Sequence, residues 1–349
     1  MHFASDNSGP VHPKILEALT RANEGYAMGY GADDQTTRAT QMIRDVFEAP
    51  EASVHFVATG TAANALALAT MVEPFETVFC SDVAHIHEDE CNAPEFFTGG
   101  AKLTLVPTDD GRMTPEALRS SINGEENRGV HGPQRGPVSI TNVTERGTVY
   151  SVAAIKALTD VAKGFDLAVH LDGARFANAL VSTGASAAEM TWKAGVDAVS
   201  FGGTKNGCMG VEAVVFFDPK HGREFELRRK RGGHLFSKYR YLAAQMTGYL
   251  ENDLWLDLAR KANMANTRLV EGLRRSNSAD FLWSPDANMT FATLPAETHE
   301  ALFGAGASYH LWEGALDGAA PDTPIGARFV CDWSMTEATV DAFLAHLKP

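Results

Sequence analysis

Residues 196–207 (VDAVSFGGTKNG) run from an apolar segment into two glycines and then a single lysine, Lys205. The first part, 196–201, predicts a short buried strand, because glycines bound the apolar run on both sides. Residues 212–217 (EAVVFF) predict a second strand, so Lys205 lies in the connection between two core elements. A lysine in such a connection usually extends into solvent, and the alternative is that the protein holds it inward for a chemical purpose. The rest of the sequence has to decide between the two.

Seven apolar runs of strand length occur in the first 217 residues: 54–58, 77–80, 102–106, 137–143, 166–172, 197–201 and 212–217. Helical stretches separate many of them, among them 62–71, 115–121, 152–163 and 187–194. The runs are continuously apolar rather than alternating, which is typical of strands covered on both faces. We therefore expect an α/β fold with a mostly parallel seven-stranded sheet.

The character of the chain changes after residue 240. A long helical stretch at 242–273 is followed by an apolar segment at 283–294, a short helix near Glu300 and strands at 308–312 and 327–333. The pair Ser334 and Glu337 has the spacing of a capping box and predicts the start of a last helix. These elements predict a smaller α+β domain, so we expect a large domain at 1–250 and a small one at 251–349.

Composition restricts the classes of function. The chain has 349 residues and a formal net charge of −14, which argues against nucleic acid and anionic membrane surfaces as partners. One basic run, 228–231 (RRKR), is short enough to be a solvated helix face. No apolar run approaches the length of a membrane span, and four widely spaced cysteines show no zinc-site spacing. We expect a cytoplasmic protein with reduced thiols and no bound metal.

Two segments at predicted strand ends carry candidate binding groups. Residues 59–64 (TGTAAN) lie between a strand and a helix, where free backbone N–H groups and the helix dipole suit a phosphate. Thr59 as an ordinary helix N-cap explains the same residues equally well. In residues 170–175 (HLDGAR), Asp172 could pair with Arg175, or with a protonated ring nitrogen, which would leave Arg175 for an anionic oxygen.

Two further side chains suggest covalent and stacking chemistry. A lysine held in a dry pocket near other positive groups shifts toward the neutral amine and can form an imine, which gives Lys205 a possible role. His85 directly follows a predicted strand, where an imidazole can stack on a planar cofactor or move a proton. Phosphate cradle, carboxylate, amine and imidazole are the parts that a pyridoxal 5′-phosphate site needs.

This ordered set resembles the aspartate-aminotransferase-like fold of pyridoxal phosphate enzymes (fold type I). Within that fold the chain is similar to the bacterial low-specificity L-threonine aldolase family almost from end to end. The segments that carry the resemblance are 4–7 (ASDN), 30–37 (YGADDQTT), 56–64 (FVATGTAAN), 84–97 (AHIHEDECNAPEFF), 170–179 (HLDGARFANA) and 191–207 (TWKAGVDAVSFGGTKNG). Residues 140–151 (ITNVTERGTVYS) depart from the more widespread family form, which has an acidic residue and a histidine there, so substrate preference stays open.

The resemblance implies roles for the cofactor-binding residues. Lys205 forms the Schiff base, Asp172 keeps the pyridine nitrogen protonated, and His85 stacks on the ring. The phosphate is bound by Gly60 and Thr61 with help from Thr204. Gly202 and Gly203 are expected to allow close approach to the cofactor.

It also implies how the substrate is held. The substrate carboxylate would be bound by Arg175, which also lies at the cofactor, by Arg328 and by Ser5, from an N-terminal segment (1–14) that reaches the active site. His131 would lie near the substrate hydroxyl. Tyr30 and the cofactor-binding Lys230 would enter the site of a neighbouring subunit, which implies a homotetramer built as a dimer of dimers with shared active sites.

The implied reaction is retro-aldol cleavage of L-threonine, L-allo-threonine or a related β-hydroxy-α-amino acid to glycine and an aldehyde. The general base is open among His85, His131 and an ordered water. Alternatives are a phenylserine aldolase, transamination or β-elimination on the same fold, and a non-catalytic protein that binds the cofactor.

Overall fold

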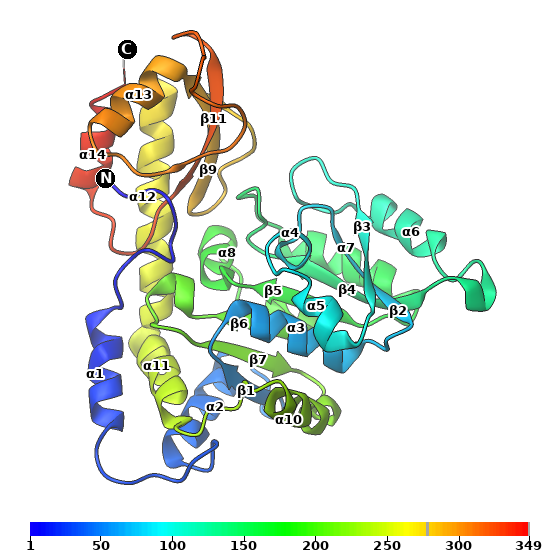
Figure 1. Cartoon of the computed structure of the whole chain (residues 1–349). Helices are drawn as coiled ribbons and strands as arrows, with labels where there is room; N and C mark the ends of the chain where they lie inside the picture. Colours follow the sequence, from blue (N-terminus) through cyan, green and yellow to red (C-terminus); the bar gives the residue numbers. More distant parts are fainter. Residues whose placement is uncertain (277–278, 348–349) are drawn as a thin grey trace.

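The computed structural model describes residues 1–276 and 279–347, which form a large body and a smaller one joined by a long helix (Figure 1). The large body contains a seven-stranded sheet in the order β1-β7-β6-β5-β4-β2-β3. Its strands are β1 (Ser53–Val57), β2 (Glu76–Ser81), β3 (Lys102–Val106), β4 (Gln134–Thr141), β5 (Val169–Gly173), β6 (Ala198–Gly202) and β7 (Glu212–Phe216). Each overlaps one of the seven apolar runs, so the predicted sheet is confirmed.

The sheet is parallel except for β7, which is antiparallel to both β1 and β6. Only residues 203–211 connect β6 to β7, and a parallel pair needs a longer crossover. This short connection places Lys205 at the edge of the sheet where β4, β5 and β6 end, the usual ligand site of an open parallel sheet.

Helices cover both faces of the sheet (Figure 1). One layer contains α3 (Gly60–Met71), α5 (Ala93–Thr98) and α10 (Gly222–Arg231), and α4 (His85–Glu88) follows β2. The other layer contains α6 (Pro115–Gly124), α7 (Val152–Lys163), α8 (Phe176–Thr183) and α9 (Ala187–Met190). Residues 62–70 of α3 are all buried, which explains why this helix is apolar on every side. Its N-terminus is thereby fixed against the sheet edge.

The basic run at 228–231 is not entirely solvated, contrary to expectation. It forms the last turn of α10, and Arg229 in it is buried. The Arg229 guanidinium donates to the Phe56 carbonyl at 3.1 Å and lies over the ring of Tyr239. These contacts compensate for the charge that is removed from water.

The N-terminal helices α1 (Pro13–Ala22) and α2 (Asp34–Val46) pack against α11 (Arg240–Leu250). The predicted long helix at 242–273 is broken at 251–253, where Asn252 and Asp253 have φ of 54° and 55°, and continues as α12 (Leu254–Ser276). We propose the domain division at this break, beside the expected boundary at 250.

The smaller body contains a four-stranded antiparallel sheet in the order β10-β11-β9-β8. Its elements are β8 (Asp280–Phe281), β9 (Met289–Pro295), α13 (Ala296–Gly304), β10 (His310–Leu311), β11 (Pro324–Val330) and α14 (Glu337–Leu344). Phe3, from the other end of the chain, packs in its core against Phe329 and Phe343. The N-terminal segment therefore starts in the small body before it crosses to the large one (Figure 1).

The predicted capping box of the last helix is wrong. The N-cap of α14 is Thr336, whose side chain accepts from the Thr339 N–H at 3.2 Å. The Ser334 hydroxyl instead donates to Asp332 at 2.7 Å, so it is not available as a cap. None of the helices within residues 1–276 and 279–347 combines the length and the hydrophobicity that a membrane span requires.

Candidate active site

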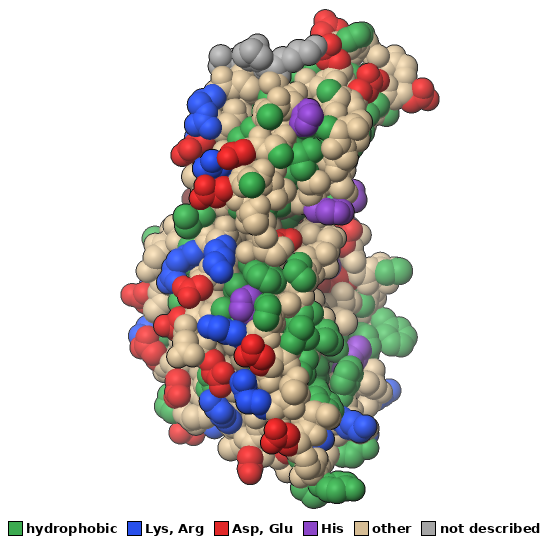
Figure 2. All heavy atoms as spheres, turned by 90° about the vertical axis from the view of Figure 1, so that its left-hand side faces the viewer, with side chains coloured by type: hydrophobic (Ala, Val, Ile, Leu, Met, Phe, Trp, Pro, Cys, Tyr) green, Lys and Arg blue, Asp and Glu red, His purple; other side chains and the backbone are tan. Residues whose placement is uncertain are grey.

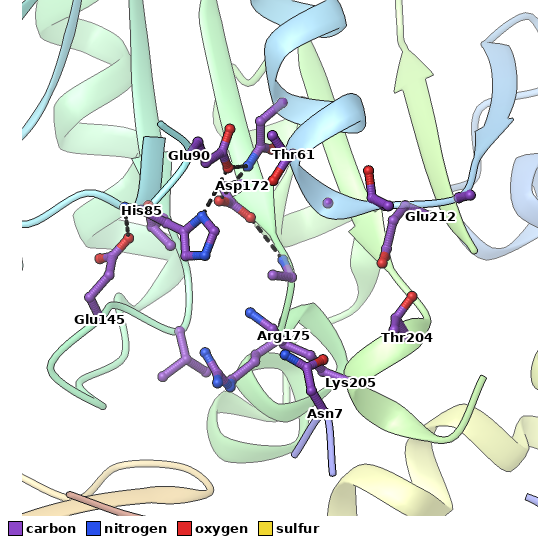
Figure 3. A pocket seen from close by; sticks show the side chains of 17 residues that line it. Asn7, Thr61, His85, Glu90, Glu145, Asp172, Arg175, Thr204, Lys205 and Glu212 are labelled. Carbon is purple, nitrogen blue, oxygen red and sulfur yellow. Dashed lines mark hydrogen bonds and ion pairs between the residues drawn. The ribbon is translucent and has the colours of Figure 1, made fainter. Parts of the chain in front are cut away.

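A pocket opens where β4, β5 and β6 end and α3 begins (Figure 3). Its wall includes most of the residues that the sequence predicts for the cofactor: Gly60, Thr61, His85, Asp172, Arg175, Thr204 and Lys205. These residues are separated by up to 145 positions in the chain but meet because the strands that carry them end at one sheet edge. The structure thus brings the predicted phosphate, ring and amine groups to a single cavity.

Lys205 lies in a 3-10 turn, η3 (Thr204–Asn206), directly after β6. Burial, and then the positive charge of Arg175, lower the pKa of its ammonium group. In the described part of the chain no hydrogen bond or ion pair holds this amine, so the neutral, nucleophilic form is favoured relative to a solvated lysine. The alternative of a lysine extended into solvent is therefore excluded.

The glycines before Lys205 serve a different purpose from the one expected. A Cβ at Gly202 would lie 2.5 Å from the Ala174 carbonyl oxygen, and one at Gly203 would lie 2.8 Å from the Val211 carbonyl oxygen. Both glycines are thus required where the backbone of neighbouring segments packs against this turn. Neither of them lines the pocket.

Asp172 is at the end of β5 and is buried. Its Oδ2 accepts from the Asn64 side-chain amide at 2.8 Å, and its Oδ1 accepts from the Ala174 N–H at 3.0 Å. Neither bond is a cation pair with Arg175, so the first of the two alternatives for Asp172 is wrong. The carboxylate keeps acceptor capacity toward the pocket.

His85, the first residue of α4, is tied to Asp172 through two other side chains. Its Nδ1 lies 2.9 Å from Glu90 Oε1, and the Asn64 amide donates to the same oxygen at 3.0 Å. The hydrogen bond to Glu90 raises the pKa of His85, and the charge of Asp172 adds to the effect against the opposing effect of burial. Because Nδ1 is bound to Glu90, Nε2 is the ring nitrogen that remains available to a bound molecule.

Arg175 is paired with Asp6 from the N-terminal segment. Its Nε lies 2.6 Å from Asp6 Oδ2, and its Nη2 lies 3.0 Å from Oδ1. Burial alone would raise the pKa of Asp6, but the charges of Arg175 and Lys205 outweigh it and lower the pKa. A bidentate pair of this kind fixes the plane of the guanidinium.

Arg328 and Ser5 lie next to this pair rather than in the pocket wall. Arg328, on β11, is half-buried and donates to the Ala4 carbonyl at 3.3 Å, while its Nε is buried without a partner. Burial and the charge of Arg175 lower its pKa. The Ser5 hydroxyl accepts from the Asn7 N–H at 3.1 Å. The unpaired Nε makes Arg328 a candidate anion donor.

The N-terminus of α3 forms a cradle for an anion. Thr59 is the N-cap and accepts from the Ala62 N–H at 3.2 Å, which leaves the N–H groups of Gly60 and Thr61 without intrahelical partners. A Cβ at Gly60 would meet no atom within 4 Å, so the space in front of it is open. The Thr59 cap and the anion site are therefore compatible rather than alternatives.

Three predicted residues lie elsewhere. His131 is exposed in a 3-10 turn, η1 (Gly129–His131), which precedes the start of β4, whereas the pocket is at the end of that strand. Lys230 Nζ lies 4.9 Å from the ring centre of Tyr30, in a surface depression of the large body. The structure does not bring any of the three to the pocket of its own chain.

Sequence reasoning missed several groups that shape the site. Asn64 and Asp6 lie inside the quoted segments 56–64 and 4–7 but had no assigned role, because their partners are distant in sequence. Glu90, Glu145 and Glu212 are pocket residues that carry no recognisable spacing. Burial raises the pKa of Glu145 and of Glu212 to about 7 in each case.

The fold and the site together define a pyridoxal 5′-phosphate enzyme of the aspartate-aminotransferase-like type. The family model described as beta-eliminating lyase matches residues 2–296, and the chain belongs to this family.

Named relatives agree with this assignment. A low specificity L-threonine aldolase of Pseudomonas aeruginosa is 40% identical over 95% of this chain and 92% of its own length. One from another Pseudomonas strain is 37% identical over 99% and 96% of the two chains. Among solved structures, Leishmania major threonine aldolase superposes with a TM-score of 0.92 at 27% identity, over 99% of this chain and 98% of that one.

The residues present fit this cofactor. The free N–H groups of Gly60 and Thr61 suit its phosphate, and Lys205 offers an unpaired amine with a lowered pKa. Asp172 places a buried carboxylate where a ring nitrogen could donate to it, and His85 supplies an imidazole on the same wall. In Figure 3, Thr61, Asp172 and His85 lie at one end of the cavity, and Lys205 and Arg175 lie at the other.

Proposed function

We propose that this protein cleaves L-threonine, L-allo-threonine and related β-hydroxy-α-amino acids to glycine and an aldehyde. The observation that carries the proposal is the arrangement of Lys205, Asp172 and the pair of His85 and Glu90 around one cavity, in a chain whose near full-length relatives are named low specificity L-threonine aldolases. The activity would make it an aldehyde-lyase. A cytoplasmic location stays a prediction.

The cofactor, when bound, supplies an aldehyde for amines and a ring that accepts the electron pair of a breaking bond at Cα. Lys205 would hold the cofactor through its amine, whose pKa is lowered. Asp172 would accept a hydrogen bond from the ring nitrogen and so favour electron flow toward it. Asn64 and the Ala174 N–H hold this carboxylate in place.

Arg328 and Arg175 would bind the substrate carboxylate. Arg175 is oriented by Asp6, and Arg328 has an unpaired Nε, so an incoming carboxylate would satisfy a donor that is otherwise orphaned. Before a substrate binds, the two guanidinium groups and the single carboxylate of Asp6 leave a net positive charge beside the pocket, which favours an incoming carboxylate.

His85 is the candidate general base. When Glu90 accepts from Nδ1–H, Nε2 is the free acceptor that can take the proton of the β-hydroxyl as the Cα–Cβ bond breaks. The charge of Glu90 stabilises the imidazolium that results. His131 does not enter this scheme within one chain.

The test is a coupled aldehyde assay with the four stereoisomers of threonine and the four of phenylserine as substrates. We expect glycine and acetaldehyde from the L-threonine pair, and the same assay decides whether phenylserine is preferred. Lys205→Ala should lose both the yellow absorbance of the loaded protein and the cleavage. Release of a keto acid without glycine would indicate β-elimination if ammonia accompanies it and transamination if it does not. Full occupancy by cofactor without release of an aldehyde or a keto acid would indicate a non-catalytic protein.

We also propose that the protein is a homotetramer, a dimer of dimers with shared active sites. Exposed apolar side chains support an interface: Tyr26, Met28, Tyr30, Leu227 and Phe236 all lie on the surface. Figure 2 shows hydrophobic side chains gathered along one side of the large body. Exposed apolar side chains that gather on one side of a protein are typical of an interaction surface.

Complementation tests the shared site. Lys205→Ala and Lys230→Ala subunits should each be inactive, and their mixture should regain partial activity because a mixed dimer has one site with both lysines intact. Light scattering gives the assembly size. Failure of the mixture to regain activity after subunit exchange, which mass spectrometry verifies, would contradict the shared site.

A further inference from the structure

Glu212 places a carboxyl group in the pocket that contains the proposed phosphate cradle. It is the first residue of β7 and pairs in register with Val57 at the end of β1 and Gly202 at the end of β6. This position brings it to the sheet edge where α3 starts, and it lines the same pocket as Gly60 and Thr61. Its side chain is 6% exposed. The pocket proposed to hold a phosphate thus also contains an acidic side chain.

The hydrogen bonds of Glu212 come from the turn that carries Lys205. Its Oε2 accepts from the Gly203 N–H at 2.9 Å, and the Thr204 hydroxyl also interacts with the carboxyl. Figure 3 shows Glu212 and Thr204 directed toward each other beside the N-terminus of α3. The carboxyl is therefore fixed toward the cavity rather than free to turn away from it.

In the described part of the chain no ion pair joins Glu212 to a Lys or Arg side chain. Four ionisable groups interact electrostatically with Glu212: Lys205 on η3, Asp172 on β5, Cys208 in the β6–β7 connection and Tyr249 on α11. Lys205 favours the charged form and Asp172 opposes it, while the thiol and the phenol both have raised pKa values and stay neutral. Burial is the largest influence and raises the pKa of Glu212 to about 7.

A phosphate monoester is mostly a dianion above pH about 6. A second negative charge beside it in a buried site is strongly unfavourable, and like charges that share a site keep one proton between them. A protonated carboxyl group, in contrast, is a hydrogen-bond donor.

We propose that Glu212 holds a proton in the cradle and donates it in a hydrogen bond to the phosphate group of the cofactor, so that phosphate and one proton bind together. The inference rests on the proposed phosphate position at Gly60 and Thr61. It adds a donor that the N-terminus of a helix does not supply by itself.

Proton-linked binding has a measurable consequence. At a pH above the pKa that Glu212 has in the cofactor-free protein, one proton must be taken up with each phosphate that binds. The affinity for the phosphate therefore falls by up to about tenfold for each pH unit. Affinities for pyridoxal 5′-phosphate and for pyridoxal, which lacks the phosphate, both depend on Lys205 and on the ring. Their ratio therefore isolates the phosphate contribution at each pH.

The experiment measures this ratio for the cofactor-free full-length protein between about pH 6.5 and about pH 9. In the wild type the ratio should fall by at least tenfold across this range. In Glu212→Gln, whose amide donates at every pH, it should be large and nearly constant. Glu116→Gln removes an exposed carboxyl on α6, outside the pocket, and should leave the wild-type slope unchanged.

A wild-type ratio that does not change with pH would overturn the proposal, even if the Glu212→Gln protein failed to fold. An unchanged slope in a folded Glu212→Gln variant would also overturn it. Thr61→Pro, which removes one cradle N–H, tests the phosphate position separately from the role of Glu212. If it lowers the ratio while Glu212→Gln does nothing, the phosphate position stands and only the role of Glu212 fails; if it has no effect, the proposed position itself is wrong.

Discussion

Arg175 and Asp6 form a buried two-point ion pair, with Nε 2.6 Å from Oδ2 and Nη2 3.0 Å from Oδ1. The two residues are 169 positions apart, and the pair attaches the N-terminal segment to the end of β5. The same segment begins in the core of the small body through Phe3. The ion pair therefore links the position of Arg175, the arginine proposed to bind the substrate carboxylate, to the packing of both bodies.

Replacement of Asp6 by Asn should weaken substrate binding more than cofactor binding. The amide cannot hold the guanidinium from two oxygens, so Arg175 loses its fixed plane. Charge-assisted hydrogen bonds contribute about 1.5–3 kcal/mol, which predicts a rise in KM of roughly 10- to 100-fold with a smaller change in kcat. Steady-state kinetics of the cofactor-loaded variant test this, and an unaltered KM would remove Asp6 from the substrate site.

Replacement of Glu90 by Gln should lower the pKa of His85, because the hydrogen bond that His85 donates to Glu90 is the largest cause of its elevation. The acid limb of the kcat/KM profile should move to lower pH, and the rate should fall because the imidazolium is less stabilised. Titration of the His85 ring by NMR measures the pKa directly. Glu88→Gln, on an exposed residue of the same helix, is the matched control and should change neither quantity.

Replacement of Asp172 by Ala should separate cofactor attachment from catalysis. Lys205 is unaltered, so the yellow absorbance should remain, whereas loss of the partner of the ring nitrogen should lower kcat by about 10²–10³-fold or more. Absorbance spectra and the aldehyde assay are measured on the same sample. Wild-type turnover in a fully loaded variant would show that this carboxylate has no part in the reaction.

Glu145 should make stability depend on pH. The pKa of Glu145 is about 7 in the folded protein, compared with an ordinary value of 4.5. The contribution of its protonated form to folding stability is therefore fully present below pH 4.5 and is lost as pH rises through 7. Glu145→Gln should therefore be more favourable to stability at about pH 8 than at about pH 5, by roughly 1–3 kcal/mol.

Thermal unfolding of the cofactor-free protein at the two pH values measures the difference. The exposed Glu116→Gln on α6 is the control and should show no such change. If the Glu145 and Glu116 substitutions had equal effects at both pH values, ionisation of Glu145 would not lower the stability of the folded protein.

The elements that the sequence predicted well are those set by local pattern. Continuous apolar runs gave all seven strands of the large sheet, and α7 (Val152–Lys163) coincides with its predicted range. Errors occurred where neighbouring polar residues compete for the same bonds. Ser334 has the spacing of a cap, but Asp332 binds its hydroxyl and Thr336 takes over the N-cap position.

The sequence by itself determined the fold class and the groups at the strand ends, because apolarity and residue type are local and a parallel sheet places its strand ends together. Only the tertiary structure decided which group pairs with which. Asp172 accepts from Asn64 rather than from Arg175, since Asp6 reaches Arg175 from the other end of the chain. It also decided the raised pKa of Glu212, because burial, the largest cause, is a property of packing and not of sequence.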